Sequence, residues 1–246
     1  MEEPAHLRAT NVSCVVGGWT LFAGQSLAVS KGGVLFVQGP SGVGKSTLLR
    51  VLCCLEPLAE GEVSLDGQSP DSLGLPAWRA RVSLIAQARV ALQGTIREHF
   101  VVLLELASQR RRLATRERAT TADLIAELES ALEQVGLQST EHDRFLDRRW
   151  ETLSGGEYQR TQVCIGLALR IPVLLLDEPT SALDERSALL VESLLEASEA
   201  TLVWVSHDSA QAERIRRGAR AGKVSSLILT PFVAPAAPAR ISLGIV

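Results

Sequence analysis

The chain has little net charge, few cysteines and no long apolar run. Its 246 residues carry a formal net charge of −3, so it lacks the basic surplus that is typical of proteins that bind nucleic acid or anionic lipid. The four cysteines are Cys14, Cys53, Cys54 and Cys164. No pair of them has the spacing of metal ligands, which favours reduced thiols in a cytosolic protein.

Signals for secretion or membrane insertion are also missing. The sequence starts Met-Glu-Glu-Pro, which is acidic and has no apolar segment of a signal peptide, so we do not expect secretion. The longest uncharged run, residues 224–239, is interrupted by Pro231, Pro235 and Pro238, and it is too short and broken to span a bilayer. We therefore expect a cytoplasmic protein whose connection to a membrane comes through a partner.

Short apolar segments alternate with helical ones along most of the chain. Residues 34–37 are wholly apolar, as expected for a strand that is buried on both faces. A glycine-rich loop follows them, and a helix is expected from residue 47. Further strands are expected at 27–29, 61–65, 82–86, 173–176, 201–205 and 224–229, and further helices at 122–135 and 187–197. This alternation predicts an α/β fold with a mostly parallel sheet and helices on both faces.

Residues 88–170 differ from the rest of the chain, because strand signals fade and Leu, Ala, Glu and Arg dominate. We expect a helical subdomain there, inserted into a single domain of residues 1–229. The core of that domain would then comprise 1–87 and 171–229. The remaining residues, 230–246, form a tail rich in Pro and Ala, which we expect to be loosely ordered.

A basic cluster lies within the helical insert. It comprises Arg110, Arg111, Arg112, Arg116 and Arg118. A solvated helix face is the favoured interpretation of such a run of charge, and contact with nucleic acid is the alternative.

The glycine-rich loop has the spacing of a P-loop, Gly-x4-Gly-Lys-Ser, between a strand and a helix. In this motif the backbone N–H groups and the N-terminus of the following helix surround phosphates. Lys45 would reach the β and γ phosphates, and the Ser46 hydroxyl would bind Mg²⁺. The expected nucleotide contacts are Gly39, Pro40, Ser41, Gly42, Val43, Gly44, Lys45, Ser46 and Thr47.

Polar side chains follow three other predicted strands. Asp177 and Glu178 end the strand at 173–176, His207 follows the strand at 201–205, and Gln87 ends the strand at 82–86. Asp177 suits Mg²⁺, and Glu178 suits the polarisation of an attacking water. His207 could hold the phosphate and the water, and Gln87 could contact Mg²⁺ or the water. We therefore expect Glu178, His207 and Gln87 to be catalytic.

Taken together, these motifs resemble those of ATP-binding cassette (ABC) ATPases over roughly residues 7–215. The family's signature motif is matched by Leu153, Ser154, Gly155, Gly156 and Glu157, and the loop after its catalytic glutamate by Ser181, Ala182, Leu183 and Asp184. The resemblance implies a P-loop NTPase (RecA-like) core, an antiparallel β subdomain near the N-terminus and a helical insert. It also implies ATP and Mg²⁺ as cofactors.

The resemblance further implies a head-to-tail pair of subunits that share ATP. Ser154, Gly155, Gly156 and Glu157 of one copy would approach the phosphates held by the P-loop of the other, and Asp184 would cross the interface. A Ser-Gly-Gly turn at a helix N-terminus is itself suited to an anion. Glu157 is a departure from the family pattern, which more often has Gln there.

The adenine end of the site is a second departure. Family members place an aromatic ring ahead of the first turn, where this chain has Val15 and Val16. Either Trp19 or Phe22 takes that place, or adenine is held by apolar contact alone.

The chain has one cassette and no membrane span, so it looks like the separate ATPase subunit of a transporter that works with a permease. Residues 93–100 resemble the stretch at which export-type cassettes receive the permease. The chain is also similar to bacterial ATPase subunits of an exporter linked to iron homeostasis. The alternatives are a soluble ABC ATPase that acts on nucleic acid or ribosomes, and a regulatory module without turnover. Intact Glu178 and His207 argue against the last.

Overall fold

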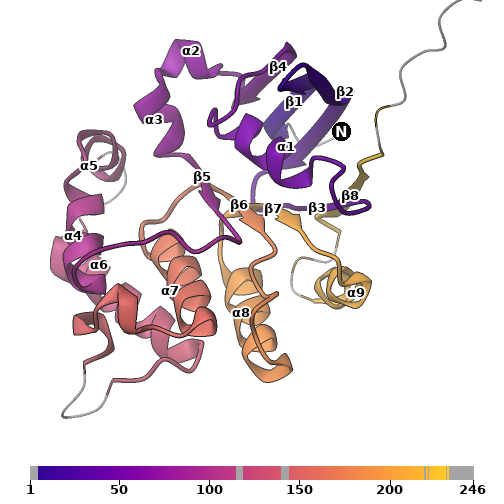
Figure 1. Ribbon diagram of the computed structural model, residues 1–246. Coiled ribbons are helices and arrows are strands. Elements are labelled where there is room, and N and C mark those ends of the chain that lie inside the picture. The colour runs from indigo at the N-terminus through magenta and orange to yellow at the C-terminus, as the bar shows by residue number, and fades with distance from the viewer. Residues whose placement is uncertain are drawn as a thin grey trace, which may run out of the picture.

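The computed structural model describes residues 5–114, 119–139, 144–218, 220, 222–230 and 232 (Figure 1). The strands are β1 (Ala5–Val16), β2 (Trp19–Ser30), β3 (Val34–Gln38), β4 (Glu60–Leu65), β5 (Val82–Ile85), β6 (Val173–Asp177), β7 (Thr201–Val205) and β8 (Val224–Ile228). The helices are α1 (Lys45–Leu52), α2 (Pro70–Leu73), α3 (Leu75–Arg79), α4 (Ile96–Glu105), α5 (Ala107–Ala114), α6 (Thr121–Gln134), α7 (Gly155–Ala168), α8 (Glu185–Ala197) and α9 (Ser209–Arg217). Two short 3-10 turns, η1 (Phe145–Asp147) and η2 (Trp150–Thr152), precede α7.

Five strands form a parallel sheet in the order β5-β6-β7-β3-β8. Successive side chains of a strand point to opposite faces, and both faces of this sheet are covered. Phe36 of β3 stacks on Trp204 of β7 on the face of α7 and α8. Val37 and Val205 face the opposite side, where α1 packs. The sequence prediction of an α/β fold with a mostly parallel sheet is confirmed.

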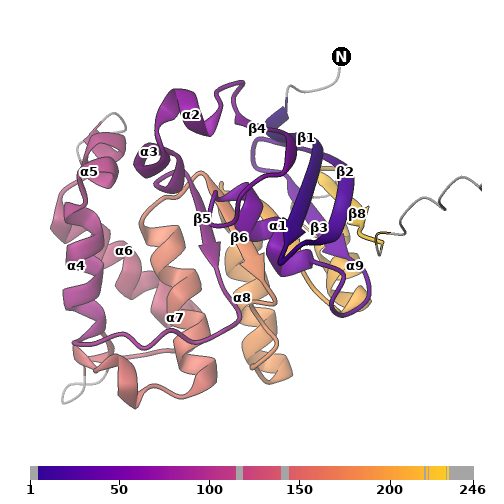
Figure 2. The same ribbon diagram turned by 45° about the horizontal axis from the view of Figure 1, so that its top comes forward.

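A smaller antiparallel sheet, in the order β2-β1-β4, covers α1 (Figure 2). Its buried residues, among them Leu7, Val12 and Phe22, join the same apolar cluster as the α1 residues Leu48 and Leu52. The P-loop is therefore held between two sheets. This arrangement confirms the antiparallel subdomain, and it adds β1, a strand that the sequence pattern does not predict.

The helices α4 to α7 pack together to one side of the parallel sheet (Figure 1). In α6 the side chains of Leu124, Leu128 and Leu132 recur at helical spacing and are buried, which stabilises the fold by roughly 1.5–3 kcal/mol for each residue. A capping box between Thr120 and Asp123 begins this helix. Within the described residues, no helix combines the length and the apolar character that crossing a membrane requires.

The basic cluster is only partly solvated. Arg110 and Arg111 are exposed, but Arg112 is buried and its guanidinium donates to the carbonyls of Leu169 and Arg170. Those carbonyls follow α7, and the last carbonyls of a helix have no partner within the helix. The prediction of a solvated face is thus wrong for Arg112. Residues 116 and 118, and the tail beyond 232, lie outside the described residues.

Candidate active site

The P-loop joins the end of β3 to the start of α1. Gly39, Gly42 and Gly44 have φ angles of 147°, 77° and 100°, a region that L side chains rarely adopt. A Cβ on Gly39 would lie 2.3 Å from the carbonyl oxygen of Leu229. The chain just after β8 is held there because the Leu229 N–H donates to the Gln38 carbonyl at 2.8 Å. Backbone geometry and close approach both require glycine in this loop.

Lys45 lies inside the curve of the loop. Its side chain is only 6% exposed, and its ammonium donates to the carbonyl oxygens of Gly39 and Pro40 at 2.9 Å each. Lys45 is also the first residue of α1, whose N-cap Gly44 has no side chain to satisfy the helix N–H groups. A positive charge and a helix N-terminus therefore meet at one point, an arrangement suited to phosphate.

Ser46 and Asp177 connect α1 to the end of β6. The Ser46 hydroxyl donates to Asp177 Oδ1 at 3.1 Å. Burial raises the pKa of the Asp177 carboxyl, the Ser46 hydrogen bond lowers it, and the neighbouring Glu178 carboxylate raises it again. A hydroxyl and a carboxylate beside a second carboxylate form an all-oxygen set of the kind that Mg²⁺ prefers. The residues present therefore fit the cation expected from the sequence.

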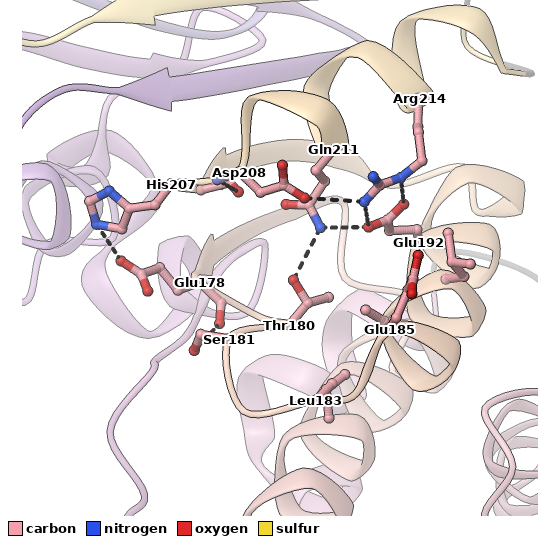
Figure 3. A pocket seen from close by; sticks show the side chains of 13 residues that line it. Glu178, Thr180, Ser181, Leu183, Glu185, Glu192, His207, Asp208, Gln211 and Arg214 are labelled. Carbon is pink, nitrogen blue, oxygen red and sulfur yellow. Dashed lines mark hydrogen bonds and ion pairs between the residues drawn. The ribbon is translucent and has the colours of Figure 1, made fainter.

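Glu178 sits between residues from two other strand ends, and Figure 3 shows its contact with one of them, His207. Its Oε1 atom lies 2.9 Å from His207 Nε2, and its Oε2 atom accepts a hydrogen bond of 3.0 Å from the Gln87 amide. The backbone of Glu178 has a φ of 50°, which is uncommon for a residue other than glycine. Gln87 Nε2 also lies 3.4 Å from the Ser181 hydroxyl. The structure therefore brings Gln87, Glu178 and His207 together.

A polar network lies behind His207, at the start of α9 (Figure 3). Arg214 binds both carboxylate oxygens of buried Glu192, at 2.9 and 2.7 Å, and hydrogen bonding to Glu192 raises the Arg214 pKa. The Gln211 amide donates to Glu192 and to the Thr180 hydroxyl at 2.8 and 3.1 Å. Glu178 and His207 line the same cavity, of about 420 Å³, as these residues. The network fixes α9 against α8 and so supports the residues that precede α9.

The signature residues lie at the N-terminus of α7, which both ribbon views show apart from the P-loop before α1 (Figures 1 and 2). Ser154 is the N-cap of α7 and forms a capping box with Glu157. Partial burial raises the pKa of Glu157. The hydrogen bonds from Ser154 and the charge of Arg148 together lower it by more, so the net shift of the pKa is downward. A Cβ on Gly155 would have no atom of this chain within 4 Å. The chain's own packing therefore does not require glycine at this position.

Asp184 is the N-cap of α8. Its carboxylate accepts hydrogen bonds from the backbone N–H and the hydroxyl of Ser187, at 2.9 and 2.8 Å. These bonds lower the pKa of the Asp184 carboxyl. Within one copy of the chain, Asp184 thus caps a helix.

Sequence reasoning missed two residues that contact this site. The Gln159 amide is 5% exposed; it donates to the Glu178 carbonyl at 2.7 Å and accepts from the Ala182 N–H at 3.2 Å. Arg89 donates to the carbonyl oxygens of Trp150 and Leu153. Each residue is two positions from a recognised motif residue, Glu157 or Gln87, which is the only signal that the sequence offered.

The structure separates the aromatic alternatives for adenine. Phe22 is fully buried, and its ring is among the nearest atoms to the Cβ position of Gly44. Trp19 begins β2 at the tip of the β1–β2 hairpin and is 79% exposed, with Val15 and Val16 half-exposed beside it on β1. Of the two rings, therefore, only that of Trp19 is open to a ligand.

A cassette of this kind, with a P-loop between two sheets and a helical segment that carries a second glycine turn, defines a class of ATPases. The ABC transporter family model matches residues 22–181, and the chain belongs to this family. It is an ATP-binding cassette, and ATP hydrolysis is its activity.

Solved structures agree with this assignment. The ATP-binding subunit of an ABC transporter is similar with a TM-score of 0.75 at 20% identity, over 91% of this chain and 85% of that chain. An ATP-bound bacterial Atm1-family ABC exporter has a TM-score of 0.71 at 26% identity, over 94% of this chain and 37% of the exporter. A dimeric post-hydrolysis ATP-binding cassette with ADP and Pi has a TM-score of 0.67 at 25% identity, over 83% of this chain and 89% of that chain.

Proposed function

We propose that this chain is the ATP-hydrolysing subunit of a transporter and that it drives a separate membrane permease. The observation that carries the proposal is the position of the Glu178 carboxylate between Gln87 and His207. It lies next in sequence to Asp177, which contacts Ser46 at the start of α1. A base beside a phosphate-binding loop is the arrangement that ATP hydrolysis needs.

Each residue has a distinct role in this proposal. Residues 39–47 surround the phosphates through backbone N–H groups, and Lys45 exchanges its two carbonyl contacts for the β and γ phosphates. Ser46, Asp177 and Gln87 provide oxygen atoms for Mg²⁺, which neutralises phosphate charge when bound. Glu178 orients and polarises the attacking water, and His207 holds the Glu178 carboxylate and the γ phosphate.

A second copy of the chain completes the site. The signature turn, residues 154–156, presents Ser154 at a helix N-terminus, with open space above Gly155, so another molecule can approach its backbone closely. The similar cassette in a dimeric post-hydrolysis state supports a pair of subunits. In the head-to-tail arrangement, the signature turn, with Gly156 and Glu157, faces the partner's P-loop, and Asp184 lies at the interface.

The permease would dock in a groove of about 530 Å³ between α3, α4 and α7. Leu75, Leu103 and Leu106 line it, and Leu75 and Leu106 are 44% and 48% exposed. An apolar groove of this kind fits one face of an amphipathic helix, and we assign it to a cytoplasmic helix of the permease. The groove includes part of residues 93–100, and the similar Atm1-family exporter favours export. A metal- or iron-related cargo is the narrower form of this proposal.

Two further assignments follow from this function. Trp19 stacks on adenine, because its ring is the exposed one of the two and stands beside Val16 at the tip of the β1–β2 hairpin. The helical subdomain 88–170 moves against the core of 1–87 and 171–229 during the cycle. The chain then resides in the cytoplasm, on the inner face of the membrane, where the permease holds it.

The test is copurification from detergent-solubilised membranes, combined with ATPase assays of the isolated chain. We expect an integral membrane protein to copurify, and Leu106→Arg to remove it without loss of ATPase activity. Leu55→Arg is the matched control, since Leu55 is 53% exposed outside the groove. Recovery of ribosomes or nucleic acid in place of a membrane protein would contradict the transporter assignment.

A further inference from the structure

Two neighbouring residues of one loop are held by two different parts of the molecule. The Gln87 amide donates to Glu178 Oε2 and to the Ser181 hydroxyl, both in the core, at 3.0 and 3.4 Å. Arg89 instead donates to backbone carbonyls just ahead of the signature turn, at 2.8 Å for Leu153. Only Ala88 separates the two residues, so the loop joins the catalytic carboxylate to the signature turn.

The guanidinium of Arg89 fits its site closely. It donates through its two Nη atoms to the carbonyls of Leu153 and Trp150, and its Cζ atom lies 5.2 Å from the centre of the Tyr158 ring. The Tyr158 hydroxyl accepts a hydrogen bond of 3.1 Å from the Val90 N–H. A planar fork that binds two carbonyls while stacking on a ring is specific to arginine, and lysine cannot reproduce it.

Backbone hydrogen bonds also join the segment after Arg89 to the segment that leads into the signature turn. The Ile96 N–H donates to the Arg148 carbonyl at 3.1 Å, and the Trp150 N–H donates to the Gly94 carbonyl at 3.2 Å. The start of α4 and the approach to the signature turn are therefore bonded at several points. Arg89 is therefore bonded to the segment that leads into the signature turn, whereas the Gln87 side chain is bonded to Glu178.

A cavity between these parts leaves room for movement. It measures about 210 Å³, and Gln87, Arg89, Gly155, Gln159 and Ser181 are among its lining residues. Cα atoms two residues apart are separated by at most about 7 Å. A shift of the signature turn by a few ångströms therefore cannot leave both ends of this short loop where they are.

We propose that Arg89 is a positioning residue that couples the signature turn to Gln87. When the signature turn moves toward the phosphates of a second copy, Arg89 draws the loop with it and changes the contact of Gln87 with Glu178. Hydrolysis then proceeds only when the second copy is engaged. Gln159 also joins α7 to the turn after β6, but it bonds backbone atoms there, and among the described residues it makes no hydrogen bond with Gln87. This inference rests on the hydrolytic role proposed for Glu178.

The test is a double-mutant cycle on steady-state ATP hydrolysis by the full chain. Arg89→Met keeps the aliphatic stem and removes the fork, and Gln87→Ala removes the side chain through which Arg89 is proposed to act. We expect Arg89→Met to lower kcat by at least tenfold, with KM for ATP changed less than twofold. In the Gln87→Ala background, the same substitution should lower kcat less than twofold further.

Matched variants separate coupling from loss of structure. Arg110→Met removes an exposed arginine on α5 and should leave kcat unchanged. Arg89→Lys keeps the charge without the fork, and its kcat should fall as that of Arg89→Met does. If Arg89→Met does not fold, Arg89→Lys takes its place in the double-mutant cycle. The inference is overturned if Arg89→Met lowers kcat by the same factor in both backgrounds, or if Arg89→Lys retains full activity. Absence of hydrolysis by the wild-type chain would instead contradict the proposed function.

Discussion

Glu178 Oε1 lies 2.9 Å from His207 Nε2, although the two residues follow different strands of the parallel sheet. The strands β6 and β7 are neighbours in exact register, with Asp177 opposite Val205, so polar residues that follow them emerge side by side. The carboxyl ends of parallel strands form the usual ligand site of such sheets. The same edge receives Gln87, which follows β5 on the other side of β6.

The Glu178 carboxylate should be required for hydrolysis but not for ATP binding. We expect Glu178→Gln to reduce kcat by at least about 100-fold, because the amide cannot act as a base. ATP affinity should stay within about threefold, since the P-loop contacts come from other residues. The variant should accumulate as an ATP-bound dimer, seen by size-exclusion chromatography with ATP.

A matched control for this variant is Glu133→Gln, which changes an exposed glutamate of α6. It should hydrolyse ATP at the wild-type rate and show no trapped dimer. Undiminished turnover by Glu178→Gln would refute the role of Glu178.

Lys45 should be required for nucleotide binding itself. Its ammonium is proposed to exchange two P-loop carbonyls for the β and γ phosphates of ATP, and a hydrogen bond to a charged group is worth about 1.5–3 kcal/mol. We therefore expect Lys45→Ala to raise the Kd for ATP by about 10-fold or more, measured by isothermal titration calorimetry. The exposed Lys31 offers a control, and Lys31→Ala should leave the Kd unchanged. Equal affinity of Lys45→Ala and wild type would remove Lys45 from the phosphate site.

Trp19 should report adenine binding by its fluorescence. The other three tryptophans, Trp78, Trp150 and Trp204, are at most 1% exposed, so quenching by an added nucleotide comes from Trp19. We expect ATP to quench the emission of the wild-type chain but not of Trp19→Leu. Loss of the ring should weaken ATP binding by about 1–3 kcal/mol, the usual value of a base stacked on an aromatic side chain. Unchanged affinity would show that apolar contact alone holds adenine.

The phosphate and catalytic residues were predictable because their chemistry is encoded locally. Strand, glycine loop and helix follow one another around Lys45, and acidic residues end an apolar run at Asp177. The rules of parallel sheets then place these strand ends at one edge, without knowledge of side-chain contacts. The sequence does not state the order of the strands. The structure places β3, which leads into the P-loop, between β7 and β8, and so brings the P-loop close to the residues that follow β6 and β7.

Residues whose role depends on distant backbone atoms were not predictable. Arg89 binds carbonyls 61 and 64 positions away, and Arg112 binds carbonyls 57 and 58 positions away. In the sequence both are ordinary charged residues. The carbonyls that Arg112 satisfies are left without a helical partner only when α7 ends, and those that Arg89 binds come near it only when the segment before α7 folds against the loop after β5. The choice between Trp19 and Phe22 likewise depends on the register of β1 and β2, which buries one ring and exposes the other.

Half-buried His99 should make the fold sensitive to acid. It is a residue of α4 that lines the groove, edge-on to the ring of Trp150, and burial lowers its pKa from the usual 6.5. The folded state therefore binds a proton less readily than the unfolded state. Stability from this residue is fully present above about pH 6.5 and is lost as the pH falls from there toward the lowered folded pKa.

Replacement of this imidazole should remove that part of the acid sensitivity. Between pH 7.5 and pH 5.5, a range of about two pH units centred on the usual histidine pKa, we expect the Tm of His99→Phe to fall less than that of the wild type. Thermal denaturation in parallel buffers measures both values. Both proteins are compared at about pH 8 as well, where the imidazole is neutral in either state, so that any change in packing is measured separately. A pH dependence of Tm that is the same for both proteins would show that the protonation of His99 does not contribute to unfolding.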